Sequence, residues 1–332
     1  ENRYRLLEAL RAYARAKLAD SGEAKAIHQH HAALFLDLAQ RAEPELVRAQ
    51  QQLWLTRLET EHANLRAALT YLLTDGDRAS ALRLATALHR LWDYRGYVSE
   101  GREWLRKTLA DRGNATLEAQ AKALNAAGWL AYRESDLAQA QRYHEEALFL
   151  AEQAEDELGI VDTLQHLAVI AMDLGDYGIA EERIEKSLTL ARALPYQQGI
   201  ARALTRLGSL AWDQDRITEA LAYRQESLRI EQALGNQVNM AMSFLGIGDA
   251  ERFLGNVEAA QQNYEESLKL SKALGHKGLI GAAVKGLGML AFKQEAYAQA
   301  HYFGEEALRI FREVGDQAHI GFALTNLGDV AR

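Results

Sequence analysis

A fixed period of 40 residues constrains this chain more than any other feature of its sequence. A five-residue motif with Gly or Ala in second place recurs along the chain without a gap. Its copies begin at Ala127, Leu167, Leu207, Ile247, Leu287 and Leu327. A repeat of this length is one supersecondary unit that cannot bury its apolar face alone, so neighbouring repeats must stack.

A second set of small residues follows each motif by twelve positions. It consists of Ala140, Ala180, Ala220, Ala260 and Ala300. Turn signals such as Gly175-Asp176 separate the two sets, and Leu234-Gly235-Asn236 separates successive repeats. The chain has only two prolines, Pro44 and Pro195, so almost every segment is free to be helical. Each repeat is therefore predicted to be helix, turn, helix, turn, and the fold class all-α.

The small residues at 128, 168, 208, 248 and 288 predict close approach of the two helices in each hairpin. Larger side chains there would hold the helices apart. Within a repeat, Leu164, Leu167, Ala168 and Ala171 follow the spacing of one buried helical face.

Composition excludes several classes of function. The net charge is −8 with acidic and basic residues interleaved, so this segment is not expected to bind nucleic acid. The chain has no cysteine, which rules out disulfides, thiolate metal sites and a cysteine nucleophile. Apolar runs such as 167–172 are far shorter than the roughly 18 residues that span a bilayer. We expect no membrane partner and a soluble, cytoplasmic protein.

With residue 128 counted as the eighth position, each repeat has small residues at its eighth, twentieth and twenty-seventh positions, and Leu follows the last of them. This pattern resembles the tetratricopeptide repeat in its longer variety of about 40 residues. The usual proline closing the second helix is missing, and that helix continues to residues such as Leu234. The resemblance covers residues 115–332 as five full repeats and one helix. It implies a right-handed α-solenoid of helical hairpins with a 40-residue period.

Upstream of this array, residues 44–114 are interpreted as degenerate helical repeats. Gly101 takes the place of Ala140 there, and residues 49–74 are predicted to form one long helix. Residues 1–43 are predicted to be an N-terminal helical junction with helices over 3–19 and 23–42. We expect the chain to be a piece of a longer protein that continues beyond residue 332.

Residues 3–14, Ser21-Gly22-Glu23, residues 31–35 and residues 54–69 resemble one further family. They are similar to the junction that follows the nucleotide-binding and winged-helix domains of bacterial signal-transduction ATPases of the NB-ARC class. The resemblance implies the sensor half of such a protein, often a transcriptional regulator, with self-association of the full-length protein left open. No phosphate-binding Gly-x-x-x-x-Gly-Lys motif occurs, so no ATP site or other cofactor is expected here.

Candidate chemical motifs have simpler structural explanations. His28 and His31 share a helical face as metal ligands can, but no carboxylate completes a set, so no metal is expected. The glycines at 246, 248, 286 and 288 are predicted to serve packing rather than phosphate binding, and among the four in helix 277–294 only Gly288 has an expected packing role. Glu251, in a column of alanines, is expected to find a partner or turn to solvent.

The leading hypothesis is a non-enzymatic domain that senses a ligand or partner through the concave face of the solenoid. A stand-alone peptide-binding adaptor that clamps a carboxylate terminus would need Lys and Asn at set groove positions of adjacent repeats, and the residues in those columns do not fit this pattern. An enzyme would need a paired nucleophile and base. A protein, a peptide and a small metabolite all remain open as ligands, and no catalytic residue is predicted.

The predicted ligand-binding residues lie on the first helix of each repeat, outside its packing columns. They are Trp129, Tyr132, Arg133, Met172, Asp173, Arg202, Trp212, Asp213, Arg252, Phe253, Lys285, Phe292 and Lys293. Trp212 and Phe253 are the expected apolar anchors, because aromatic side chains dominate binding hot spots. Arg202, Arg252 and Lys285 are expected to set the polarity of the face.

Overall fold

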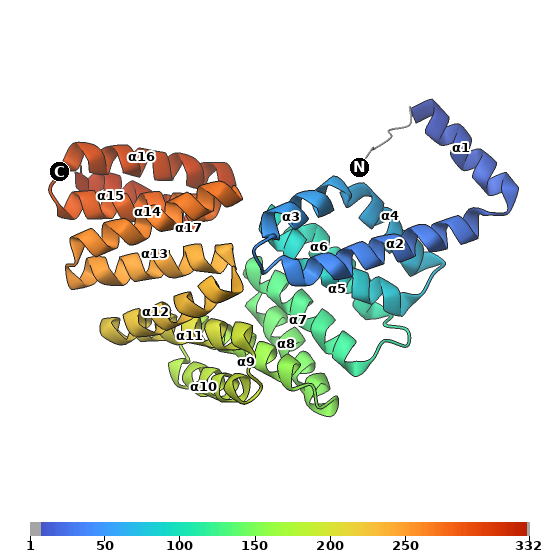
Figure 1. The fold of residues 1–332 in the computed structure, drawn as a ribbon, viewed down its shortest axis with the longest axis horizontal. Coiled ribbons are helices and arrows are strands. Elements are labelled where there is room, and N and C mark those ends of the chain that lie inside the picture. The colour runs from blue at the N-terminus through green and yellow to red at the C-terminus, as the bar shows by residue number, and fades with distance from the viewer. Residues whose placement is uncertain (1–7, 331–332) are drawn as a thin grey trace.

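The computed structural model describes residues 8–330 as an array of helical hairpins preceded by a group of N-terminal helices (Figure 1). Residues 3–7 of the first expected helix, and Ala331 of the last motif copy, lie outside the described range. The described part contains helices and no strand, which confirms the all-α solenoid. The leading helices are α1 (Glu8–Ser21), α2 (Ala24–Glu45), α3 (Gln51–Thr60), α4 (His62–Thr74), α5 (Arg78–Arg95) and α6 (Val98–Ala110).

The 40-residue repeats follow as alternating first and second helices. The first helices are α7 (Leu117–Arg133), α9 (Glu157–Asp173), α11 (Gln197–Asp213), α13 (Gln237–Leu254), α15 (Lys277–Lys293) and α17 (Gln317–Val330). The second helices are α8 (Leu137–Gln153), α10 (Tyr177–Ala193), α12 (Ile217–Leu234), α14 (Val257–Leu274) and α16 (Tyr297–Val314). Each first helix from α7 to α15 packs most extensively on its own second helix, as a stack of hairpins requires, and α17 packs on α16.

Tight turns join these helices where the sequence predicts them. Gly235 and Gly275 end α12 and α14 with φ of +70° and +65°, a backbone conformation that glycine adopts without steric cost. At the starts of α9 and α13, Asp156 and Asn236 accept hydrogen bonds from the amides of Gly159 (3.0 Å) and Asn239 (3.3 Å). These side chains satisfy amides that the first turn of a helix leaves free.

The N-terminal helices differ from the sequence-based expectation in one respect. The single helix expected over residues 49–74 is wrong, because the structure breaks it at Glu61 into α3 and α4. The break lets both pieces pack inward, with Leu58 and Leu65 fully buried on either side of it. Pro44 lies inside the last turn of α2.

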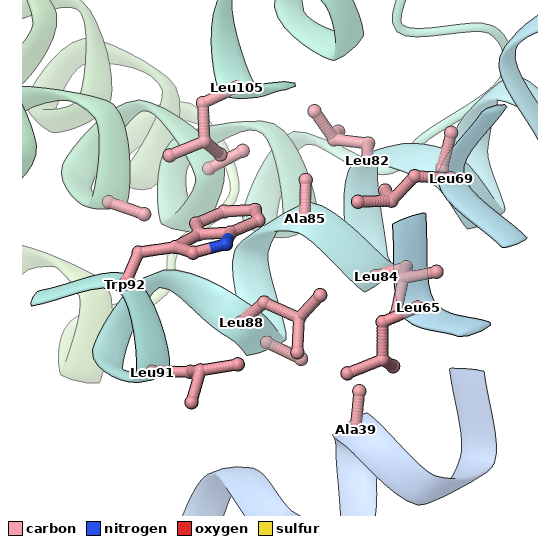
Figure 2. Close-up of a cluster of buried hydrophobic side chains, with 14 of the residues drawn as sticks. Ala39, Leu65, Leu69, Leu82, Leu84, Ala85, Leu88, Leu91, Trp92 and Leu105 are labelled. Atoms are coloured by element: carbon pink, nitrogen blue, oxygen red, sulfur yellow. The ribbon is translucent and has the colours of Figure 1, made fainter. Parts of the chain in front are cut away.

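One apolar core joins the N-terminal helices to the first repeat. Figure 2 shows Trp92 of α5 among leucines of its own helix and of α6, including Leu88 and Leu105. The same cluster extends from Ala32 in α2 to Ala147 in α8. The buried core crosses both domain boundaries that were expected from the sequence, at 43/44 and at 114/115. These boundaries therefore remain a proposal about how the sequence is divided.

The small-residue columns allow close helix packing, as expected. A Cβ on Gly208 would lie 3.3 Å from the carbonyl oxygen of Ala220, and one on Gly288 would lie 3.6 Å from that of Ala300. The expectation that only Gly288 of α15 has a packing role is wrong. A Cβ on Gly281 would come within 2.7 Å of the Phe311 ring, and one on Gly286 within 2.5 Å of the Tyr264 ring.

The array curves with its first helices on the inner side. Neighbouring first helices contact one another directly, as α7 does α9, whereas second helices pack mainly on first helices. The curvature brings Gly235, in the turn after α12, against Ala49 in the turn after α2, with 3.2 Å from an added Cβ to the Ala49 Cβ. No helix of residues 8–330 is both long and apolar enough to cross a membrane.

Candidate functional site

The inner face is interrupted between α11 and α13. Direct packing between neighbouring first helices is seen for α7 on α9, α9 on α11 and α13 on α15, but it is nearly lost between α11 and α13. We call the inner surfaces of these two helices, with the side chains that enter between them, the seam. The seam contains both apolar anchors predicted from the sequence.

Arg224 enters the seam from the second helix α12. Its guanidinium lies over Gly246 of α13, where any Cβ would collide with it. One amino group donates a hydrogen bond to Ser209 Oγ of α11 (3.2 Å), while Nε is buried without a partner. Burial lowers the pKa of Arg224, and the carboxylates of Asp249 and Asp213 counteract this only from a distance. Within residues 8–330 Arg224 forms no ion pair.

Arg202 and Arg206, one turn apart on α11, bring two further guanidinium groups to the same region. Arg202 is paired with Asp162 and also contacts the Tyr196 hydroxyl (3.1 Å). Burial opposes the charge of Arg202, but Asp162 outweighs it and the pKa is raised. Arg206 has no hydrogen bond or ion pair to any described side chain. Burial lowers its pKa, and the charges of Arg202 and Arg224 lower it further.

Tyr264 also reaches the inner face from a second helix. Its ring is buried and occupies the space beside Gly248 and Gly286. Its hydroxyl donates to Asp249 Oδ1 (2.7 Å) and accepts from Arg252 Nε (3.2 Å). Burial and the Asp249 carboxylate raise the pKa of Tyr264.

Aromatic side chains line the C-terminal ends of the first helices. The rings of Trp212 and Phe253 meet edge to face with centroids 5.9 Å apart across the seam, and Phe253 is 59% exposed. Phe292 contacts Tyr297 in the same way at 5.9 Å. Asp213, next to Trp212, has its pKa raised by partial burial, which Arg224 counteracts. Exposed aromatic edges beside charged groups are typical of binding surfaces.

The predicted residues of α7 form a separate polar cluster with α5 and α9. Asp93 of α5 accepts hydrogen bonds from Trp129 Nε1 (2.7 Å) and Arg133 Nε (2.9 Å). Trp129 stacks on Tyr132 and on His166 of α9, with centroids 5.5 and 5.6 Å apart. Burial and Asp173 raise the pKa of Tyr132 to about 12. The polar and aromatic groups of this cluster contact one another, so fewer of them remain available to a ligand than at the seam.

The remaining predicted residues are more scattered. Met172 packs against the apolar core of its repeat. Lys293 donates to the backbone oxygen of Arg252 (2.8 Å), which keeps it near the seam. Lys285 lies over the ring of Phe322 at 5.7 Å, on a different ridge of the inner face.

Sequence reasoning missed Arg206, Arg224, Tyr264 and His166. Arg206 and His166 occupy the sixth position of their repeats, counted with Gly208 and Ala168 as the eighth, and the sixth was not among the positions chosen for the face. The other two belong to second helices and reach the inner face only because Gly246 and Gly286 leave room. Those glycines were the available signal, since both replace larger residues of the sixth-position column, such as His166.

The other motifs have ordinary structural places. His31 packs on Phe35 with ring centroids 4.6 Å apart, and burial lowers its pKa. His28 stacks on Tyr71. No cluster of three potential metal ligands occurs among the described residues. Glu251 accepts a hydrogen bond from Asn256 (2.7 Å), the local partner expected of it.

Comparison with known families assigns the repeats. A family model for the tetratricopeptide repeat matches residues 160–233, 199–273 and 237–313. Residues 160–313 are therefore tetratricopeptide repeats, in agreement with the 40-residue hairpins.

Curated relatives match a shorter stretch. Proteins named HTH-type transcriptional regulators from Mycobacterium bovis and Mycobacterium tuberculosis are 40% identical over 110 residues. The match covers 33% of this chain and 12% of each relative. The chain thus spans only a small part of the regulators that it matches.

Solved structures share the fold at low sequence identity. A signal transduction ATPase with numerous domains and a tetratricopeptide-repeat sensor, from Pyrococcus horikoshii, aligns with TM-score 0.60 and 18% identity over 81% of this chain and 43% of that one. A Rap protein complexed with competence and sporulation factor aligns with TM-score 0.66 and 14% identity over 91% and 86%. NprR in complex with its cognate peptide NprX aligns with TM-score 0.57 and 14% identity over 90% and 81%.

Proposed function

We propose that this chain is the sensor domain of a larger signal-transduction ATPase that regulates transcription, and that it binds a peptide or protein segment at the seam. The observation that carries the proposal is the edge-to-face contact of half-buried Trp212 with exposed Phe253 across the seam, to which Arg206 and Arg224 also contribute half-buried guanidinium groups without an ion pair among the described residues. Aromatic and arginine side chains are the types that dominate binding hot spots. The domain itself is not an enzyme in this proposal, and it acts in the cytoplasm.

Curated relatives and three structural neighbours support this assignment. The matched relatives are named transcriptional regulators, and one structural neighbour is a signalling ATPase with the same kind of sensor. Two others, Rap and NprR, are described in complex with a factor or a peptide. The fold alone would allow many partners, so the proposal depends on the chemistry of the seam.

The test is the double variant W212A/F253A in the full-length protein. We expect partner binding and signalling to be lost, at a cost on the order of 2 kcal/mol per anchor, with helicity unchanged. A matched control is F149A/Y302A, since both are exposed aromatics on second helices, 57% and 66% exposed. Normal signalling by a folded W212A/F253A variant would contradict the proposal.

A second measurement separates macromolecular from metabolite ligands. Purified chain is used to capture proteins and peptides from host lysate, and in parallel its melting temperature is screened against metabolites. Capture that requires Trp212 and Phe253 supports the proposal. A metabolite that raises the melting temperature of the chain, but not that of W212A/F253A, would mean that the ligand is a small molecule rather than a peptide or protein.

A further inference from the structure

The apolar core of the array is divided at the seam, where the packing between first helices is also interrupted. One cluster of buried apolar residues ends with Ile230 of α12 at its edge, and the next begins with Leu245 of α13 at its edge. These two clusters share no residue, whereas the two clusters of the C-terminal repeats both pack on Leu268 and Phe303. Since each repeat is held by its interfaces with its neighbours, the seam is the joint at which the described repeats are held least.

One end of the seam is nevertheless fixed, at the turn between α12 and α13. Glu231 of α12 is 2% exposed and accepts a hydrogen bond from Asn239 Nδ2 of α13 (2.7 Å). Asn236 is also buried and caps α13 through the amide of Asn239. Gly235 lies between the two helices with φ of +70°. These contacts make the turn a pivot for α13.

The opposite end of the seam is bridged by aromatic side chains rather than by packing of helix on helix. Trp212 and Phe253 meet there edge to face. Phe253 lies 14 residues after Asn239 on α13, which is about 21 Å along a helix axis. A small rotation at the pivot therefore becomes a larger displacement at the aromatic pair.

The pivot also abuts the N-terminal helices of the chain. The turn between α12 and α13 lies beside the turn between α2 and α3 (Figure 1). A Cβ added at Gly235 would lie 3.2 Å from the Cβ of Ala49 and 3.4 Å from its amide nitrogen. A change of angle at the seam must therefore move α13 relative to this contact or break it.

We propose that the seam is a hinge between two blocks, residues 24–234 and 237–330, and that the contact of Gly235 with Ala49 sets its resting angle. The proposal rests on the proposed function, because a partner seated on Trp212 and Phe253 bridges the two blocks and fixes the angle between them. Occupancy of the seam is thereby passed to the α2–α3 turn. Hinges of this kind absorb the backbone change in a few residues at the end of an element, and the resulting coupling of two sites is reciprocal.

The test is a set of distances between pairs of spin labels, which can be placed by substitution because the 332-residue chain has no cysteine. The pair E185C/E265C spans the seam, and the pair E145C/Q225C lies within the first block. All four residues are exposed at the same position of their second helices, and each pair is two repeats apart. Pulsed electron resonance then gives the distance distribution of each pair. We expect a broader distribution across the seam than within the block.

A substitution at the pivot tests the contact with Ala49. G235N should shift the E185C/E265C distance by more than about 2 Å, because its side chain displaces Ala49, while asparagine tolerates the left-handed backbone. The matched control is G275N, at the equivalent turn of the next repeat with φ of +65°, where an added Cβ meets nothing within 4 Å. G275N should leave both distances unchanged. W212A/F253A should broaden the distribution across the seam, because it removes the contact at the far end.

Equal widths for the two pairs in the otherwise unmodified chain would overturn the hinge. An unchanged distance across the seam in G235N, with a melting temperature that shows it folded, would overturn the role of the Ala49 contact. So would a shift of the E145C/Q225C distance, since the substitution would then distort the first block. If the hinge is found but W212A/F253A signals normally in the full-length protein, the hinge stands and the proposed function fails. If the widths are equal while W212A/F253A abolishes signalling, the proposed function stands and the hinge fails.

Discussion

The guanidinium of Arg224 occupies the space that a side chain at Gly246 would fill, although the two residues belong to helices of successive repeats. A second-helix side chain thereby becomes part of the inner face. The flexible end of the Arg224 side chain can move aside, but only by leaving the site between α11 and α13. The pair therefore links a glycine in one repeat to a charged group contributed by the preceding one.

The variant G246A should separate stability from binding. Alanine favours a helix over glycine by about 1 kcal/mol, which offsets the displacement of Arg224, so we expect the free energy of unfolding to change by less than about 1 kcal/mol. Affinity for the partner bound at the seam should fall about tenfold. The control is G178A, because a Cβ at Gly178 of α10 meets nothing within 4 Å. Urea unfolding and calorimetry measure both quantities, and full affinity in G246A would refute the link.

Removing the Tyr264 hydroxyl should destabilise the fourth repeat without emptying its core. In Y264F the ring still fills the space at Gly248 and Gly286, but Asp249 loses its donor (2.7 Å) and Arg252 loses its acceptor. We expect a loss of about 1–2 kcal/mol in urea unfolding. Y302F, at a residue 66% exposed, should change stability by less than about 0.5 kcal/mol. Equal stability of both variants would mean that the hydroxyl contributes nothing.

The repeat architecture could be predicted from the sequence because periodicity and small-residue columns depend on local spacing. The same reasoning anticipated that Trp212 and Phe253 share a surface, and the structure brings their rings to 5.9 Å. It did not anticipate Arg224 or Tyr264 on that surface. Both side chains extend to that surface because glycines of another helix leave room for them. Only the packed structure shows which glycine lies beside which side chain.

The break between α3 and α4 was missed for a related reason. Residues 49–74 carry no proline or glycine before Gly76, so local propensity allows one helix throughout. The structure nevertheless turns the chain at Glu61, and Leu58 and Leu65 are fully buried on either side of the turn. Tertiary burial overrides helix propensity at such a point.

The buried histidine of the first repeat predicts acid sensitivity. His144 is 1% exposed, and its Nδ1 lies 2.9 Å from Asn125 Oδ1, which belongs to a side-chain network with Thr163. Burial lowers the pKa of His144 from 6.5 to about 3. Between these values the unfolded chain binds the proton more tightly than the folded one, so stability is complete above pH 6.5 and falls as the pH drops towards 3.

The variant H144Q tests this linkage. One histidine contributes up to about 1.4 kcal/mol per pH unit, so the loss of stability between pH 7 and pH 5 should be about 2 kcal/mol smaller in H144Q than in the unmodified chain. His89 and His166, which are half-buried and also have lowered pKa values, remain in the variant and maintain part of the slope. Urea unfolding at several pH values measures the difference, and parallel pH curves for the two proteins would count against a neutral buried His144.

The glycines of α15 should respond to alanine in opposite directions. A Cβ at Gly278 meets only the His276 ring, at an ordinary contact distance of 3.6 Å, so G278A should stabilise the chain by about 1 kcal/mol through helix propensity. A Cβ at Gly281 would lie 2.7 Å from the ring of Phe311, which is 1% exposed and has no room to move. G281A should therefore cost about 1–3 kcal/mol by overpacking. Urea unfolding gives the two free energies, and hydrogen exchange of α15 amides should slow in G278A and quicken in G281A. If both variants shift stability the same way, packing against Phe311 does not explain the glycine at position 281.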